Sequence, residues 1–368
     1  MWEDTTTGEK YRQVVSIPDK DVRKDAILCV VRAAGLLPDD AEVQREALRV
    51  ILTQPPQAWD WAAIEQLCRN LVALDPKDTR AHYLLAEFHY QQPRIDAKGR
   101  SSGPTPADKR SRKRMLEANT HAARARATAT RTVWRTLYLQ ARIARWLRDD
   151  YARKRKEEAA QQQEKELRRL LLEEQGGVLA RAEKDGGVTG LKFYDASRAL
   201  GLHRMAVELV AEDARRGKAD LAAVQKCLEG TLAFCERMGP AGADIDRAGE
   251  CALAAAGAAE AAQPLLSDPP AAGWTGAVEK VEALGRKALA KEYPLPAPYA
   301  RLARLLLREA RLAGQRGEMA RSSKLNDDAG RWIEDGLRLG RAAKFTDAEL
   351  AELRALAAER DRSREGLK

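Results

Sequence analysis

Few residues of this chain have the types and spacing that catalysis requires. The sequence of 368 residues contains four histidines, and two of them, His82 and His89, are seven residues apart on one expected helix. Helical histidine pairs that bind one metal ion are three or four residues apart, because both rings must reach the ion. His121 and His203 have no cysteine or acidic cluster beside them in the sequence. We therefore expect no metal site, no cofactor, no small-molecule substrate and no enzymatic activity.

The glycine-containing segments and the cysteines indicate structural roles. DGGVTG and GPAGAD lack the Lys-Ser/Thr pair of a phosphate-binding loop and are typical of helix ends. The cysteines are widely spaced, form no C-x-x-C pair and mostly occupy apolar helical positions: Cys29, Cys68, Cys227, Cys235 and Cys251. Such reduced core cysteines are typical of cytoplasmic proteins. The N-terminal sequence MWEDTTTGEKYRQVV does not resemble a signal peptide, and no run approaches the ~18 apolar residues of a membrane span.

The positive charge of the chain is concentrated in residues 109–156. This segment holds 16 Lys and Arg against three acids, so it carries +13 while the net charge of the whole chain is +9. If the chain were helical throughout residues 124–153, a rotation of 100° per residue would place five arginines close to one line: Arg124, Arg131, Arg135, Arg142 and Arg153.

Two interpretations of this basic face remain open. Any helix with one side on a core exposes a polar side, and the arginines fit that description. Between residues 118 and 148, however, the segment contains no acid, which favours an anionic partner: an acidic protein surface or nucleic-acid phosphate. Few aromatic residues are available to stack on bases, so we do not expect sequence-specific readout of nucleic acid.

The composition predicts an all-α protein, because aromatic residues make up only 5% and Ala, Leu, Arg and Glu are frequent. We expect an N-terminal arm over residues 1–18, a helical domain over 19–175 and a second domain of helical hairpins over 188–368. The first domain contains a loop rich in Gly, Pro and Ser at 93–107. A helix from about 130 to 175 is expected to project from the body with the basic residues on it.

Residues 61–92 carry the strongest pattern in the chain. Two amphipathic helices flank an Asp75-Pro76 turn, and Asp78 or Thr79 can cap the second helix. The apolar positions of this hairpin are Ile64, Leu67, Cys68, Leu71 and Leu74, then Ala81, Leu84, Leu85, Phe88 and His89. The window resembles the tetratricopeptide (TPR) repeat, with His82, Leu85, Ala86 and His89 at the positions of its large-x-x-Leu-small-x-x-aromatic pattern. His82 and His89 stand where that family usually has Trp and Tyr.

The resemblance implies a solenoid of stacked hairpins that binds another protein. In TPR proteins the inner wall of the groove comes from four positions of the first helix, which here are Arg80, Tyr83, Glu87 and Tyr90. Tyr83 and Glu87 replace the Lys and Asn of the family members that clamp a C-terminal carboxylate, so that activity is not implied. Tyr299, Leu302, Ala303 and Leu306 match the pattern again near the C-terminus.

The sequence thus favours a cytoplasmic scaffold or adaptor, within a larger complex, whose TPR-like groove binds another protein. The alternative is a nucleic-acid-associated subunit that binds phosphate through residues 109–156.

Overall fold

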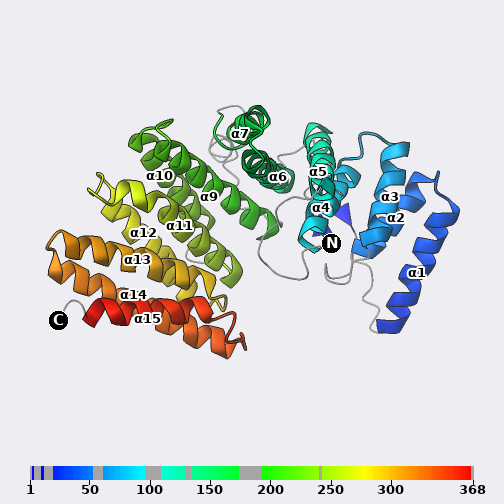
Figure 1. Cartoon of the computed structure of the whole chain (residues 1–368). Helices are drawn as coiled ribbons and strands as arrows, with labels where there is room; N and C mark the ends of the chain where they lie inside the picture. The colour runs from blue at the N-terminus through cyan, green and yellow to red at the C-terminus, as the bar shows by residue number, and fades with distance from the viewer. Residues whose placement is uncertain are drawn as a thin grey trace. The chain divides into compact units, whose positions relative to one another are not determined.

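The fold is built from α-helices. The computed structural model describes residues 2–3, 10–11, 20–52, 61–95, 109–128, 134–173, 193–239 and 243–365. Two short strands, β1 (Trp2–Glu3) and β2 (Lys10–Tyr11), pair antiparallel, and the long elements of the described residues are all helices (Figure 1). The all-α prediction is confirmed for this part of the chain.

The chain divides into two compact units, residues 1–167 and 168–368, which we describe one at a time. The expected domain boundary at residues 186–187, loop residues 96–107 and most of the expected arm 1–18 lie outside the described residues. The helices that begin in the first unit are α1 (Lys20–Leu36), α2 (Ala41–Leu52), α3 (Trp61–Leu74), α4 (Thr79–Ile95), α5 (Lys109–Thr128), α6 (Trp134–Arg153) and α7 (Glu157–Leu171). The expected loop therefore begins later than position 93, because α4 continues to Ile95.

The turn between α3 and α4 has the chemistry that the sequence predicts. Asp78 caps α4, since its carboxylate accepts a hydrogen bond of 2.9 Å from the Ala81 amide. Asp75 accepts one of 3.0 Å from the Lys77 amide. Arg45 of α2 contacts both carboxylates, at 3.3 Å from Asp75 and 3.2 Å from Asp78. These exposed ion pairs contribute little to stability, but the cap fixes where α4 begins.

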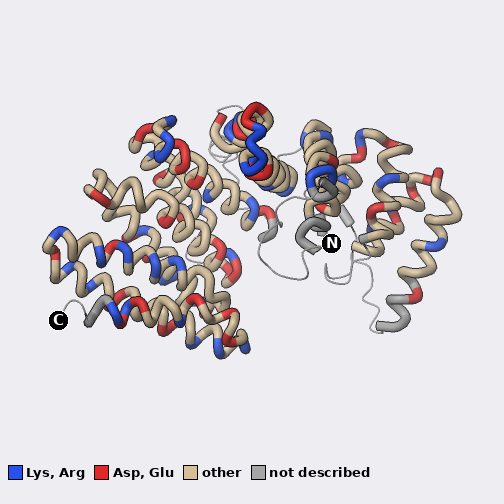
Figure 2. The backbone as a smooth tube through the Cα atoms, in the orientation of Figure 1, with Lys and Arg blue, Asp and Glu red and all other residues tan. Residues whose placement is uncertain are grey.

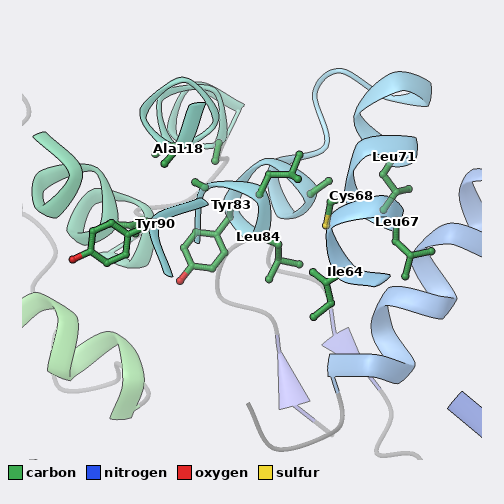
Figure 3. Close-up of a cluster of buried hydrophobic side chains, with 14 of the residues drawn as sticks. Ile64, Leu67, Cys68, Leu71, Tyr83, Leu84, Tyr90 and Ala118 are labelled. Atoms are coloured by element: carbon green, nitrogen blue, oxygen red, sulfur yellow. The ribbon is translucent and has the colours of Figure 1, made fainter. Parts of the chain in front are cut away.

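The core of the first unit is a cluster of buried side chains contributed by helices α1 to α6, part of which is shown in Figure 3. The apolar positions predicted for the α3–α4 hairpin are buried, except Leu74, which is 39% exposed at the end of α3. Residues of α2, α5 and α6 join the same cluster: Leu48, Ile51, Met115, Ala118, Ala122, Ile143 and Leu147. In this unit each helix from α1 to α6 contacts the next one along the chain, and α4 also contacts α6.

Gln44 of α2 joins three helices of this core. Its side-chain amide donates to the carbonyls of Ala34, at 2.7 Å, and Leu37, at 2.9 Å, at the end of α1. Its carbonyl oxygen accepts a hydrogen bond of 3.0 Å from Asn70 of α3. Gln44 is fully buried, and these contacts satisfy both ends of its amide.

The expected long helix over 130–175 is wrong. The helix ends at Arg153, and Arg155 adopts a left-handed conformation with φ 54°. The Lys156 amide donates to the Tyr151 carbonyl and the Arg155 amide to the Ala152 carbonyl, both at 3.0 Å. This pair of bonds is a Schellman motif, which terminates a helix and is usually built on glycine. Arginine occupies the left-handed position, so no glycine marks the end of this helix in the sequence.

The second unit contains helices in two layers. It comprises α9 (Phe193–Arg215), α10 (Leu221–Met238), α11 (Ile245–Leu266), α12 (Trp274–Ala290), α13 (Ala297–Gln315), α14 (Met319–Ala342) and α15 (Ala351–Glu365). In one layer α9, α11, α13 and α15 contact each other in that order, and α10 contacts α12 in the other. Glycine commonly follows the end of a helix, but α9 is continuous through Gly201. Packing of Leu200 and Leu202 outweighs the cost of about 1 kcal/mol for a helical glycine.

Small residues on α11 permit the close packing of this unit. The helix contacts α9, α10, α12 and α13, and most of its Ala and Gly residues are buried. A Cβ atom at Gly249 would lie 2.3 Å from the Tyr293 ring, and one at Gly257 would lie 2.7 Å from Cδ of Arg204. The alanine-rich sequence of α11 therefore reflects a helix surrounded by neighbours.

Candidate binding site

The four predicted groove residues of α4 do not form an open row. Tyr83 and Tyr90 are 6% and 4% exposed and belong to the core cluster of the first unit, while Arg80 and Glu87 are partly exposed. The cause is packing, because α4 contacts α3, α5 and α6 and its tyrosine rings fill space between helices. Helical periodicity in the sequence predicts one buried side for each helix. It therefore does not predict that Tyr83 and Tyr90, on another side of α4, are buried as well.

The five predicted arginines do not lie along one helix, because α5 ends at Thr128 and α6 begins at Trp134. Arg124 is exposed on α5, and Arg131 lies outside the described residues. The remaining three, Arg135, Arg142 and Arg153, lie on α6, and the first two are partly exposed. Figure 2 marks the Lys and Arg residues of α5 and α6 in blue. The predicted single line of charge is therefore divided between two helices.

A buried carboxylate forms ion pairs with some of the cations of the basic segment. Asp150 of α6 has no exposed surface, and its oxygens lie 2.8 Å from Nε of Arg112 and 3.1 Å from Nζ of Lys154. Arg153 is 3.9 Å from the same group. The neighbouring Arg148 pairs with Asp149 at 2.8 Å. Three of the cations counted as a surface charge thus contact an internal anion.

One predicted groove residue and one predicted anion-binding residue meet. Cζ of Arg142 on α6 lies 5.0 Å from the centre of the Tyr90 ring on α4 and 5.2 Å from the centre of the Tyr138 ring. Tyr138 and Arg142 are one turn apart on α6, so both present side chains toward α4. Cation–π contacts of this kind hold a guanidinium in a defined orientation. We call Tyr90, Tyr138 and Arg142 the tyrosine–arginine site.

Three of the four histidines of the chain form a second cluster, between α4 and α5. Nδ1 of His82 is 2.9 Å from Nδ1 of His121, and Nε2 of His82 is 3.0 Å from the Pro76 carbonyl. The carbonyl accepts, so Nε2 of His82 carries hydrogen, and in the neutral pair His121 donates through Nδ1 to His82. The His89 ring stacks on that of His121 at 6.0 Å and 12°, and its Nδ1 is 3.5 Å from Glu117.

The surroundings of His89 and His121 favour neutral rings. Burial, and then the positive charge that its neighbours would carry, lowers the pKa of His121 to about 4. Burial also lowers the pKa of His89, although Glu117 opposes the shift. The TPR-like pattern predicts packing positions for His82 and His89, and the sequence offers no partner for His121. Residue spacing within one helix gives no information about a contact between α4 and α5.

Metal-ligating side chains do not cluster into a metal site in the described residues. No group of three or more His, Cys, Asp or Glu residues among them could hold a metal ion. All five cysteines are free thiols, and burial raises the pKa of four of them, Cys68, Cys227, Cys235 and Cys251. A thiol with a raised pKa is a poor nucleophile. Among the described helices none has the length and apolar character needed to cross a membrane.

Comparison of the chain with protein-family models and with curated proteins finds no match in either case.

Proposed function

We propose that this chain is a non-enzymatic scaffold or adaptor that binds another protein through the tyrosine–arginine site of the first unit. The observation that carries the proposal is the meeting of Tyr90 from α4 with Tyr138 and Arg142 from α6. Tyrosine and arginine are enriched among the residues that dominate binding energy at protein interfaces. The TPR resemblance of residues 61–92 supports the same choice of partner, and we propose that the hairpins stack as a TPR-like solenoid.

Binding of nucleic-acid phosphate through residues 109–156 is the competing function. The charge of +13 in this segment favours it. The internal pairing of Arg112 and Lys154 with Asp150, and of Arg148 with Asp149, weighs against it. Cations held by the protein's own carboxylates are less available to phosphates, so we rank protein binding first.

Site-specific photo-crosslinking in the native cell separates these two functions. We would replace Tyr138 with benzoylphenylalanine, which keeps an aromatic ring beside Arg142, and use Lys113 as a control position, since it is 81% exposed on the basic helix α5. We expect a protein adduct at position 138 that survives nuclease treatment and is weak at position 113. Nuclease-sensitive adducts at position 113 and none at position 138 would support nucleic-acid binding instead.

We further propose that the protein works in the cytoplasm as part of a larger complex. The free state of all five cysteines supports a reducing compartment. Cell fractionation followed by size-exclusion chromatography tests this: we expect the native protein in the cytoplasmic fraction, eluting well ahead of the purified chain.

A further inference from the structure

Arg142 differs from its neighbours in how its charge is held. Its guanidinium lies beside the Tyr90 and Tyr138 rings. Within the described part of the chain it has no carboxylate partner, whereas Arg112, Arg148 and Arg153 each contact one. Contacts with aromatic faces do not use the N–H donors at the edge of the guanidinium. Arg142 therefore retains the donors that recognise anions.

The two tyrosine rings prepare Arg142 for binding. A free arginine side chain loses rotamer entropy when it is fixed, and a side chain already held by two rings loses less on meeting a ligand. The rings also replace part of the water around the cation, which strengthens its attraction to an anion. Arg142 remains partly exposed, so a ligand can approach it.

The number of cations available without a carboxylate partner indicates whether this surface suits a nucleic-acid backbone or a single carboxylate. A nucleic-acid backbone carries one charge per nucleotide and is bound by several free cations in a row. Around Asp150, by contrast, Arg112 and Lys154 are paired with the buried carboxylate, and Arg153 lies 3.9 Å from it. A single planar guanidinium matches one carboxylate, which it binds with two parallel N–H···O bonds.

We infer that Arg142 binds an Asp or Glu carboxylate in an acidic peptide segment of a partner protein, with Tyr90 and Tyr138 beside it. The inference rests on the proposed function, because it names the chemistry of the partner at the same site. Tyr90 is buried and holds the guanidinium from inside, whereas Tyr138 is partly exposed beside it, so a peptide with an acid next to an apolar residue fits the site best.

Selection of peptides by the full-length chain tests this inference. A phage-displayed random library is enriched on the wild-type protein, and the best peptide is measured by fluorescence anisotropy. We expect Asp or Glu at one fixed position of the enriched peptides. Arg142→Gln should weaken binding about tenfold, in the range of a lost charge-assisted hydrogen-bonded pair. Arg32→Gln removes the same charge from an exposed position of α1 that has no assigned binding role, and should change affinity by less than about twofold.

Three results would overturn the inference, each in a distinguishable way. Enriched peptides without Asp or Glu would rule out a carboxylate as the ligand of Arg142, but the proposed binding of a protein would still stand. Equal losses in Arg142→Gln and Arg32→Gln would indicate diffuse attraction, as would full affinity in Arg142→Lys, which keeps the charge without the planar group. Displacement of every peptide by a single-stranded oligonucleotide would favour nucleic acid, and if position 138 also gave no protein adduct, the proposed function would fail as well.

Discussion

His203 on α9 makes the stability of the second unit dependent on pH. The side chain is 1% exposed, its ring stacks on Phe234 at 3.9 Å, and burial lowers its pKa to about 3. The unfolded chain has a pKa near 6.5 at this position, so between pH 6.5 and 3 it binds a proton that the folded protein does not. Stability contributed by neutral His203 is therefore present above pH 6.5 and is lost as the pH falls.

We expect lowering the pH from 7 to 5 to cost about 2 kcal/mol of unfolding free energy through His203 alone. Urea denaturation of the wild type and of His203→Leu at the two pH values measures this, because leucine cannot take up the proton. The variant should lose about 2 kcal/mol less than the wild type over the same interval. An identical loss in both proteins would show that acid acts elsewhere.

Asp150 should contribute much more to the stability of the fold than its neighbour Asp149. Asp150 is fully buried against Arg112 and Lys154, while Asp149 is 47% exposed and contacts Arg148. Asp150→Asn leaves its cations without a counter-charge and should destabilise the protein by about 2 to 3 kcal/mol. Asp149→Asn should change stability by less than about 1 kcal/mol. Chemical denaturation of the two variants provides the comparison, and equal effects would contradict the role assigned to the buried carboxylate.

At the scale of the helices, two glycines test the close packing of α11. A Cβ atom at Gly249 would meet the Tyr293 ring at 2.3 Å, but one at Gly276 of α12 would have nothing within 4 Å. Gly249→Ala should destabilise the protein by about 1 to 3 kcal/mol through overpacking. Gly276→Ala should stabilise it by up to about 1 kcal/mol, the usual helical preference for alanine. Thermal denaturation should shift in opposite directions, and a stabilised Gly249→Ala would show that Tyr293 moves freely.

Local signals in the sequence predicted the helices and several of their ends. Asp78 caps α4. Before α15, Thr346 and Glu349 form a capping box. The Glu349 carboxylate accepts from the Thr346 amide at 2.8 Å, and the Thr346 hydroxyl accepts from the Glu349 amide at 3.4 Å. These features depend on residues within one turn of each other. The stop at Arg155 and the continuity of α9 were not predictable, because each runs against the usual preference of its residue.

The candidate site was predictable only in its parts. Tyr90 and Arg142 were each identified from the sequence, by resemblance and by charge respectively. Their meeting depends on the contact between α4 and α6, which periodicity within one helix does not determine. The same limit applies to His121, whose partners are on α4.

At the scale of the whole molecule, the two compact units should respond separately to mutation. Each has its own buried side chains, so opening of one unit need not expose the core of the other. We expect Asp150→Asn to accelerate amide hydrogen exchange mainly in helices α1–α6, and Gly249→Ala mainly in helices α9–α15. Exchange measured by mass spectrometry on both variants makes the comparison. Equal acceleration throughout the chain would indicate a single cooperative unit.

The contacts of Gln44 set the length of a surface turn. Turns between helices are normally where related sequences gain and lose residues. Here the side-chain amide of Gln44, in the first turn of α2, must reach the carbonyls of Ala34 and Leu37 at the end of α1. The residues between the two helices therefore have little conformational freedom. One glycine inserted after Pro38 should cost about 1 to 3 kcal/mol, because those carbonyls and Asn70 lose their partner. In evolutionary terms, Pro38 and Asp39 should tolerate substitution far better than any change in the number of residues between the helices, whereas Asp40 caps α2 by accepting from the Glu42 and Val43 amides.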